Sequence, residues 1–137
     1  MAQFKVTPIS HLPRSAPAAR ISLVGVSVLI VEDEPLIALD LHSALSAAGA
    51  GLMAATDTDE ALRLIHRNDV SAAILDISLG DRDCTAVCQA LLHHRIPFLF
   101  HTGQPDADMP QAWPQAPVLA KPACRDEIVG AVADLVY

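Results

Sequence analysis

Carboxylates, a hydroxyl and an ammonium group follow four short apolar segments of this chain. Glu32 and Asp33 come directly after VSVLIV, Asp76 ends SAAILD, Thr102 follows PFLFH, and Lys121 follows PVLA. Carboxylate oxygens are ligands that Mg²⁺ prefers, and three neighbouring carboxylates need such a cation because they otherwise repel one another. An aspartate beside a metal ion and a lysine can accept a phosphoryl group, since the cations stabilise charge on the transferred oxygens. If these side chains meet, they predict a magnesium-dependent phosphoryl acceptor.

The segments before these residues have the character of strands in a parallel sheet. Residues 26–31 are continuously apolar, as expected of a strand that is covered on both faces. Residues 97–100 read PFLF and are rich in side chains that favour strands. We expect the complete set of further strands at residues 51–55, 71–76, 97–101 and 117–120.

Helical spacing of apolar residues fills the intervals between these strands. Pro35 suits the first turn of one helix and Gly49 its end, while Asp57 or Thr58 can cap the next. Residues 124–136 have the pattern of a last helix. Before residue 97, four side chains at i, i+3, i+4 and i+7 predict the buried face of another helix: Cys84, Val87, Cys88 and Leu91. We interpret these cysteines as core residues rather than as metal ligands.

The alternation of strands and helices predicts an α/β fold. The connections are too short for anything but right-handed crossovers, which gives a doubly wound, five-stranded parallel sheet. In the strand order 2-1-3-4-5, the strands that end at Val31, Asp76, His101 and Ala120 are neighbours. Such sheets bind ligands at the carboxyl ends of their strands. We therefore expect the five chemically active side chains to converge at this edge.

The connection after Thr102 is rich in proline. Residues 105–117 contain four prolines, and each interior proline removes a hydrogen bond and costs about 3 kcal/mol in a regular helix. The sequence therefore predicts an irregular or shortened fourth helix. We expect Trp113, the only tryptophan of the chain, to anchor this segment to the body of the protein, with contact to a partner as the alternative.

Composition limits the class of protein. A chain of 137 residues, 52% hydrophobic and 18% charged, suits one folded domain. We expect a flexible N-terminal extension at residues 1–25 and the folded domain at residues 26–137. Residues 1–31 hold three basic and no acidic side chains, so the remainder has 6 basic and 16 acidic residues, a net charge of −10. This balance argues against nucleic-acid binding.

Two further features of the sequence indicate the cellular compartment of the protein. The apolar run after Arg20 is too short to span a membrane and has no cleavage site after it, so we expect no membrane partner. Three cysteines in a chain of this size favour a reducing compartment, and we expect a cytoplasmic protein.

Four pieces of the sequence, VLIVEDEP, AAILD, PFLFHTG and AKP, resemble in their order and spacing the receiver domain of two-component response regulators. The resemblance covers about residues 26–136 and implies a flavodoxin-like receiver fold. It implies that Asp76 accepts the phosphoryl group. It also implies a Mg²⁺ site formed by Glu32, Asp33, Asp76 and the backbone carbonyl of Ser78.

The resemblance also implies roles for the residues around the acceptor. Lys121 would contact the phosphoryl group, and Thr102 would form a hydrogen bond with it on activation. Ser78 and Gln104 occupy the positions that tune the lifetime of the phosphoryl group. The bond between Lys121 and Pro122 is expected to be cis, as is usual in the family.

Other family positions depart from the usual pattern or serve the backbone. Gly103 would let the backbone approach the site closely. Val118 stands at the switch position, where an aromatic residue is usual, so the common relay from threonine to an aromatic ring cannot operate unchanged.

PFLFHTG resembles the PFxFATG(Y) signature of an atypical, single-domain receiver subfamily. These proteins are associated with histidine kinases of the HWE type in bacterial stress signalling. The chain departs from the signature at His101, where alanine is usual, and at Gln104, where an aromatic residue is usual. We expect His101, which alternates away from Thr102, to pack under a helix as a neutral ring.

The resemblance predicts a single-domain response regulator rather than an enzyme, with only self-catalysed phosphotransfer and autodephosphorylation. Its phosphodonor would be a sensor histidine kinase, with the HWE type as one candidate class, or a histidine phosphotransfer protein. It would signal through protein contacts, or act as a phosphoryl shuttle or sink, as a monomer or weak dimer. Two alternatives stay open: a pseudo-receiver that is not phosphorylated, and an aspartyl-phosphate phosphatase. Phosphatases of the haloacid-dehalogenase type place Asp-x-Asp after the first strand, where this chain has Glu-Asp-Glu.

Overall fold

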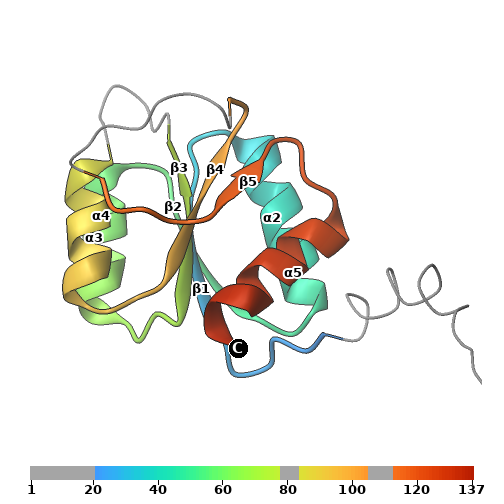
Figure 1. The fold of residues 1–137 in the computed structure, drawn as a ribbon. Coiled ribbons are helices and arrows are strands. Elements are labelled where there is room, and N and C mark those ends of the chain that lie inside the picture. The colour runs from blue at the N-terminus through green and yellow to red at the C-terminus, as the bar shows by residue number, and fades with distance from the viewer. Residues whose placement is uncertain (1–20, 78–83, 105–112) are drawn as a thin grey trace, which may run out of the picture.

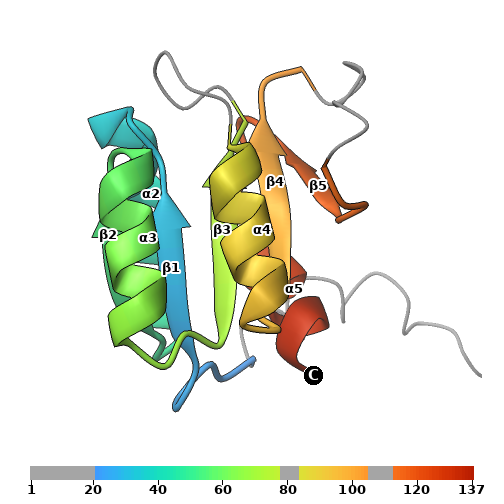
Figure 2. The same cartoon turned by 90° about the vertical axis from the view of Figure 1, so that its left-hand side faces the viewer.

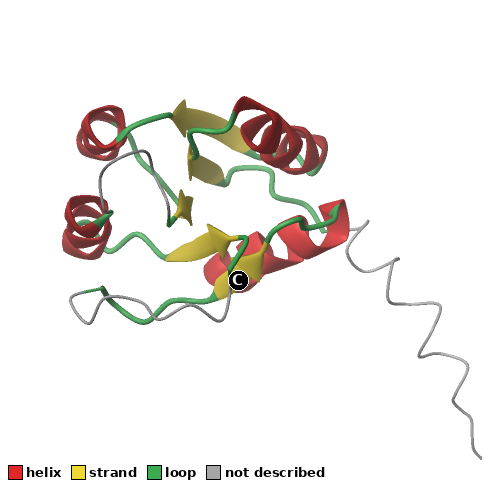
Figure 3. Cartoon of the chain, turned by 90° about the horizontal axis from the view of Figure 1, so that it is seen from above, coloured by secondary structure: helices red, strands yellow, loops and turns green. Residues whose placement is uncertain are grey.

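The computed structural model describes residues 21–77, 84–104 and 113–137. Within these ranges a parallel sheet forms the middle of three layers, as Figures 1 and 3 show. The strands are β1 (Ser27–Val31), β2 (Gly51–Ala55), β3 (Ala72–Asp76), β4 (Phe98–Thr102) and β5 (Val118–Ala120). The helices are α2 (Pro35–Ala47), α3 (Thr58–Arg67), α4 (Thr85–His93) and α5 (Arg125–Val136).

The strand order is β2-β1-β3-β4-β5, and all four neighbouring pairs are parallel. This order confirms the predicted doubly wound α/β sheet. Figure 2 shows the strands side by side, with α3 and α4 lying across one face. Helices α2 and α5 cover the other face (Figure 1). The carboxyl ends of all five strands therefore lie at one end of the molecule.

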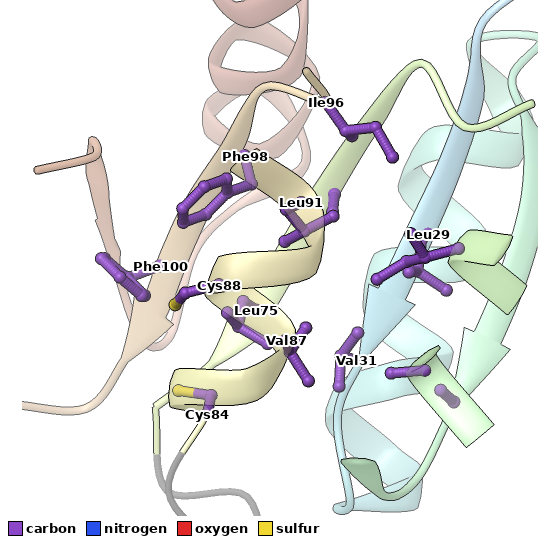
Figure 4. Packing of buried hydrophobic residues seen from close by; sticks show 14 of the residues in the cluster. Leu29, Val31, Leu75, Cys84, Val87, Cys88, Leu91, Ile96, Phe98 and Phe100 are labelled. Carbon is purple, nitrogen blue, oxygen red and sulfur yellow. The ribbon is translucent and has the colours of Figure 1, made fainter. Parts of the chain in front are cut away.

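Both faces of the interior strand β1 are buried, which explains its continuously apolar sequence. Leu29 and Val31 pack in the core on the α3–α4 side, whereas Val28 and Ile30 pack in the core on the α2–α5 side. The face of α4 was predicted correctly: Figure 4 shows its four apolar side chains against β3 and β4. Each of them is at most 1% exposed: Cys84, Val87, Cys88 and Leu91.

Local sequence signals set the ends of the helices. Asp57 caps α3, because its carboxylate accepts a hydrogen bond of 2.8 Å from the backbone N–H of Glu60. Gly49 follows the end of α2 with a φ of +98°, in the left-handed region that favours glycine. A side chain there would also collide, since a Cβ at this position would lie 2.6 Å from Cγ2 of Val24.

Residues 21–25, the last part of the predicted N-terminal extension, contact the folded domain. Leu23 is fully buried, and its backbone N–H donates a hydrogen bond of 2.7 Å to the carbonyl of Ala48. The hydroxyl of Tyr137 donates to the carbonyl of Ser22 at 2.9 Å. Residues 21–25 continue the apolar run into β1, but the burial of Leu23 depends on a contact with Ala48, which is remote in the sequence. The rest of the predicted extension, residues 1–20, lies outside the described residues.

The connection between β4 and β5 has no helix in its described parts, residues 103–104 and 113–117. Pro105 and Pro110 lie outside the described residues. Trp113 is an anchor, as predicted: it is 8% exposed and stacks on Phe100 with ring centroids 5.5 Å apart. Its indole N–H donates a hydrogen bond of 2.7 Å to Oγ1 of Thr85. Across the described ranges, every helix is too short or too polar to cross a membrane.

Candidate functional site

Three carboxylates meet at the carboxyl end of the sheet. Glu32 and Asp33 directly follow β1, and Asp76 is the last residue of the neighbouring strand β3. One carboxylate oxygen from each of these residues lies within 4.8 Å of the other two. Glu32 and Asp76 are each 2% exposed, and Asp33 is more accessible. The structure thus brings together the acidic residues that the sequence predicted would converge.

Lys121 reaches the same cluster from the residue after β5. Its Nζ lies 3.0 Å from Oε1 of Glu32 and donates a hydrogen bond of 3.2 Å to Oδ1 of Asp76. The backbone holds this lysine in place, because its N–H donates a hydrogen bond of 2.7 Å to the carbonyl of Thr102. The peptide bond between Lys121 and Pro122 is cis, as predicted.

Burial and neighbouring charge shift the acid–base properties of this cluster. Burial is the largest cause that raises the pKa of Glu32, to about 7; the hydrogen bond from Lys121 opposes this shift, and Asp76 adds to it. Burial acts to lower the pKa of Lys121. The hydrogen bond to Glu32 and the charges of both carboxylates outweigh that effect, so the pKa of Lys121 is raised. One ammonium group therefore balances only part of the acidic charge.

The donor set fits a hard divalent cation. Three carboxylates supply oxygen ligands, and their charge exceeds that of the lysine, so a cation such as Mg²⁺ would relieve the repulsion among them. Glu32, Asp33 and Asp76 are the side chains that would hold it. The fourth predicted ligand, the carbonyl of Ser78, lies outside the described residues.

Thr102 ends β4 beside this cluster and is 8% exposed. Its Oγ1 accepts a hydrogen bond of 3.0 Å from the backbone N–H of Gln104. Gly103 shows no close backbone approach in this structure, because a Cβ there would meet no described atom within 4 Å. The expected reason for glycine at this position is therefore not visible in the packing.

Val118, at the position of the usual switch aromatic, pairs in register with Phe100 and is 41% exposed. As predicted, no aromatic ring stands at this position. Sequence reasoning missed a different contact on the same side of the sheet: the stack of Trp113 on Phe100, tied to Thr85 at the start of α4. The single tryptophan in a proline-rich segment was the signal for an anchor, but nothing in the sequence indicated its partners.

His101 points away from Thr102, toward α2 and α5, and is 3% exposed, as predicted. It lines a cavity of about 80 Å³ together with Lys121, Asp40 of α2 and apolar side chains of both helices. Neither ring nitrogen has a hydrogen-bond partner among the described residues. Burial, and then the charge of Lys121, lower the pKa of His101 to about 4, so the ring is neutral near pH 7.

Two solved structures of known proteins are similar to this one. The structure is similar to the response regulator PhyR from Brucella abortus, with a TM-score of 0.74 and 24% identity over 91% of this chain and 53% of that one, a likeness that shows the shared fold. It is also similar to the BeF3-activated conformation of SdrG from Pseudomonas melonis Fr1, with a TM-score of 0.69 and 36% identity over 81% of this chain and 96% of that one.

A curated relative matches over a shorter stretch. The probable transcriptional regulator ycf27 of Guillardia theta is 41% identical over 64 residues, which make up 47% of this chain. The chain spans about half the length of the PhyR protein and only 25% of the length of this curated relative.

The sequence matches the family model of the response regulator receiver domain over residues 28–133. That range contains β2 to β5, all of β1 except Ser27, the three carboxylates and Lys121. The strand order, the acidic cluster and the sequence match agree, and this chain belongs to the response regulator receiver domain family.

Proposed function

We propose that this chain is a single-domain response regulator that accepts a phosphoryl group on Asp76. Receiver domains are signalling switches rather than enzymes that turn over a substrate. The observation that supports the proposal is the environment of Asp76. Its carboxylate ends the central strand β3, is 2% exposed, and accepts a hydrogen bond of 3.2 Å from the ammonium of Lys121. A nucleophile and a cation for the transferred oxygens thus stand side by side.

The proposed transfer starts from a phosphohistidine of a sensor histidine kinase or of a histidine phosphotransfer protein. An oxygen of Asp76 attacks phosphorus, the P–N bond breaks, and the electron pair leaves with the imidazole. Lys121 stabilises the developing charge on the phosphoryl oxygens and gives up its contact with Asp76 as they arrive. Mg²⁺, held by Glu32, Asp33 and Asp76 with the carbonyl of Ser78, would supply further charge neutralisation.

Two residues next to the acceptor would respond to the new group. The hydroxyl of Thr102 would donate a hydrogen bond to a phosphoryl oxygen, where it now accepts one from Gln104. This change would move Gln104 and the loop that follows it. Ser78 and Gln104 would tune the lifetime of the acyl phosphate. With Val118 at the usual aromatic position, the readout would pass through this loop and the Trp113 anchor.

The likeness to SdrG supports phosphorylation. Trifluoroberyllate binds carboxylates as a mimic of a phosphoryl group, and the SdrG conformation in question is described as BeF3-activated. PFLFHTG further favours a donor of the HWE type. The surface beside the site is suited to a protein donor, because α2 begins two residues after Asp33 and exposes Leu36 and Leu39.

The cellular setting is part of the proposal. We propose a reducing, cytoplasmic location because three cysteines in a chain of this size favour a reducing compartment. A bacterial source is proposed from the resemblance of PFLFHTG to the signature of the bacterial subfamily. A monomer or weak dimer is proposed, because the four prolines of residues 105–117 disfavour a regular helix in the connection from β4 to β5, and the common dimer face uses that helix. The signal would leave through protein contacts, or the protein would serve as a phosphoryl shuttle or sink.

Phosphorylation with a small phosphodonor and Mg²⁺, resolved on a Phos-tag gel, tests the proposal. Wild-type protein is expected to shift, and Asp76→Ala is expected not to. Asp134→Asn, which removes an exposed carboxylate from α5, is the matched control and is expected to shift like the wild type. A phosphotransfer profile against the histidine kinases of the host would then identify the donor.

Two outcomes would contradict the proposal. Failure of the wild type to react, under conditions that label a known receiver, would favour a pseudo-receiver. Sustained hydrolysis of a phosphomonoester would favour a phosphatase of the haloacid-dehalogenase type. The complete set of carboxylates with Lys121 argues against the first, and the Glu-Asp-Glu sequence after β1 argues against the second.

A further inference from the structure

A pair of histidines lies at the end of the molecule opposite the acidic cluster. His66 is in the last turn of α3, and His94 directly follows α4. Nε2 of His94 is 3.2 Å from Nδ1 of His66, and the ring centroids are 5.1 Å apart. Both side chains are exposed. Figure 2 shows α3 and α4 side by side. The carboxyl ends of both helices lie at the end of the molecule opposite the carboxyl ends of the strands.

The backbone positions of these two histidines are fixed independently of the rings. His66 is within the hydrogen-bonded body of α3. After His94 the chain turns through Arg95, whose φ of 58° is in the left-handed region. The N–H of Ile96 then donates to the carbonyl of Leu91 at 2.8 Å, in the manner of a helix end, and both of these side chains are buried. The two imidazoles therefore face each other from rigid supports.

The spacing of the two nitrogens fits a shared metal ion. Imidazole nitrogens bind Zn²⁺ at about 2.0–2.1 Å, so two of them on one tetrahedral ion lie about 3.3 Å apart. The observed 3.2 Å also suits an N–H···N hydrogen bond, in which one ring donates and the other accepts. To bind one ion together, each exposed ring would rotate so that its nitrogen lone pair points at the ion rather than at the other ring.

We propose that His66 and His94 form a surface site for a borderline transition-metal cation of the class of Zn²⁺, Ni²⁺ or Cu²⁺. Imidazole suits these ions and discriminates against Mg²⁺, which prefers oxygen ligands. Water completes the coordination. His93 has its ring centroid 5.3 Å from that of His94. In the described part of the chain, only the three carboxylates gather as a set of three ligand atoms within 4.8 Å.

Metal binding at this site would join the carboxyl ends of α3 and α4. Both helices pack on the same face of the sheet, and a cation that binds only the folded pair stabilises the folded state. The site has no residue in common with the acidic cluster. Its occupancy is therefore independent of phosphorylation of Asp76, and the two proposals can fail separately.

The test is a calorimetric titration of the untagged full chain with Zn²⁺. The buffer contains excess Mg²⁺, which occupies the acidic cluster. One site with micromolar affinity is expected. His66→Gln and His94→Gln are each expected to weaken binding at least tenfold. Three controls should bind like the wild type: His42→Gln, which removes an exposed histidine from α2, Cys124→Ser, which removes an exposed thiol, and Asp76→Asn.

A second measurement distinguishes ligation from a change in folding. Cu²⁺ added below one equivalent should broaden the ring NMR signals of His66 and His94 before that of His42. The melting temperatures of the metal-free histidine variants should stay within about 2 °C of the wild type, since both rings are exposed. Equal Zn²⁺ affinity in His66→Gln, His94→Gln and the wild type would overturn the proposal. Loss of binding in Cys124→Ser alone would also overturn it.

Discussion

The two ends of this sheet hold their polar groups in different ways. At the carboxyl end, Glu32 and Asp76 are 2% exposed and are balanced in part by Lys121. At the amino end, His66 and His94 face each other in contact with solvent. Buried charge destabilises the folded state unless it is compensated, whereas exposed polar groups change stability little. The carboxyl end is therefore the place where chemistry and stability oppose each other.

Lys121→Ala tests this contrast with the largest expected effect. Removal of the ammonium leaves two buried carboxylates without their counter-charge, and breaking a buried pair costs about 3 kcal/mol. Urea unfolding in EDTA at pH 8 should show this loss. The phosphorylation rate should fall about 100-fold, as when one donor to a developing anion is removed. Arg63→Ala, which removes an exposed cation from α3, should change neither quantity. If Lys121→Ala kept the wild-type free energy of unfolding and phosphorylation rate, the buried charges at the carboxyl end would not have this importance for stability and chemistry.

The pH dependence of Glu32 is the next largest effect. Its pKa is raised in the folded state, so the folded chain binds this proton more tightly than the unfolded chain does. Stability without metal should therefore fall as the pH rises from 5 to 8, by roughly 2 kcal/mol from this group. Glu32→Gln stays neutral and should lack this loss. Urea unfolding in EDTA measures the free energy of unfolding of both proteins across this pH range. If it falls equally in both, Glu32 is not the source of the pH dependence.

These two ends also differ in how much the sequence could predict. The acidic cluster was predictable because Glu32 and Asp76 end neighbouring parallel strands, and such strands share one edge. The pair of His66 and His94 was not, because the meeting of two helix ends depends on how α3 and α4 pack. The burial of Leu23 likewise depends on a contact with Ala48 that is remote in the sequence.

Beyond the strand ends, the same distinction holds. Apolar runs predicted all five strands, and helical spacing predicted the face of α4. The strand order expected for a doubly wound sheet of this kind is the observed one. The bond from Trp113 to Thr85 joins residues 28 apart and follows from no local pattern. Periodicity thus determines elements and the edges they share, while contacts between side chains of different elements require the packed structure.

Mg²⁺ should stabilise the folded state through the acidic cluster and not through the two histidines, with a smaller effect than the changes above. If the acidic cluster binds Mg²⁺ with millimolar affinity, 10 mM of the ion should stabilise the folded state by about 1.4 kcal/mol. Asp33→Asn removes one ligand from the cluster and should lose most of this gain in thermal unfolding. His94→Gln should keep all of it, because imidazole is no ligand for Mg²⁺. Equal loss in both variants would mean that Mg²⁺ acts elsewhere on the chain.

The smallest expected change in stability concerns two histidines, the buried His101 near the carboxyl end of the sheet and the exposed His94 at the other end. The pKa of His101 is lowered by burial and by Lys121, while Asp76 opposes the shift and Asp40 lines the same cavity. The unfolded chain therefore binds this proton more tightly, and stability should fall as the pH drops from 7 to 5.5, by about 1 kcal/mol from this group. His101→Leu should flatten that part of the acid limb.

The matched control for His101→Leu is His94→Gln, which removes an exposed ring and should change the free energy of unfolding by less than about 0.5 kcal/mol. His101→Leu should in addition raise stability at pH 7, because neither ring nitrogen has a partner among the described residues and leucine removes both of these buried polar atoms. Destabilisation at pH 7 would mean that His101 forms hydrogen bonds in solution, through water in that cavity. The imidazole would then be a structural link between β4 and Lys121 rather than a buried polar group tolerated beside it.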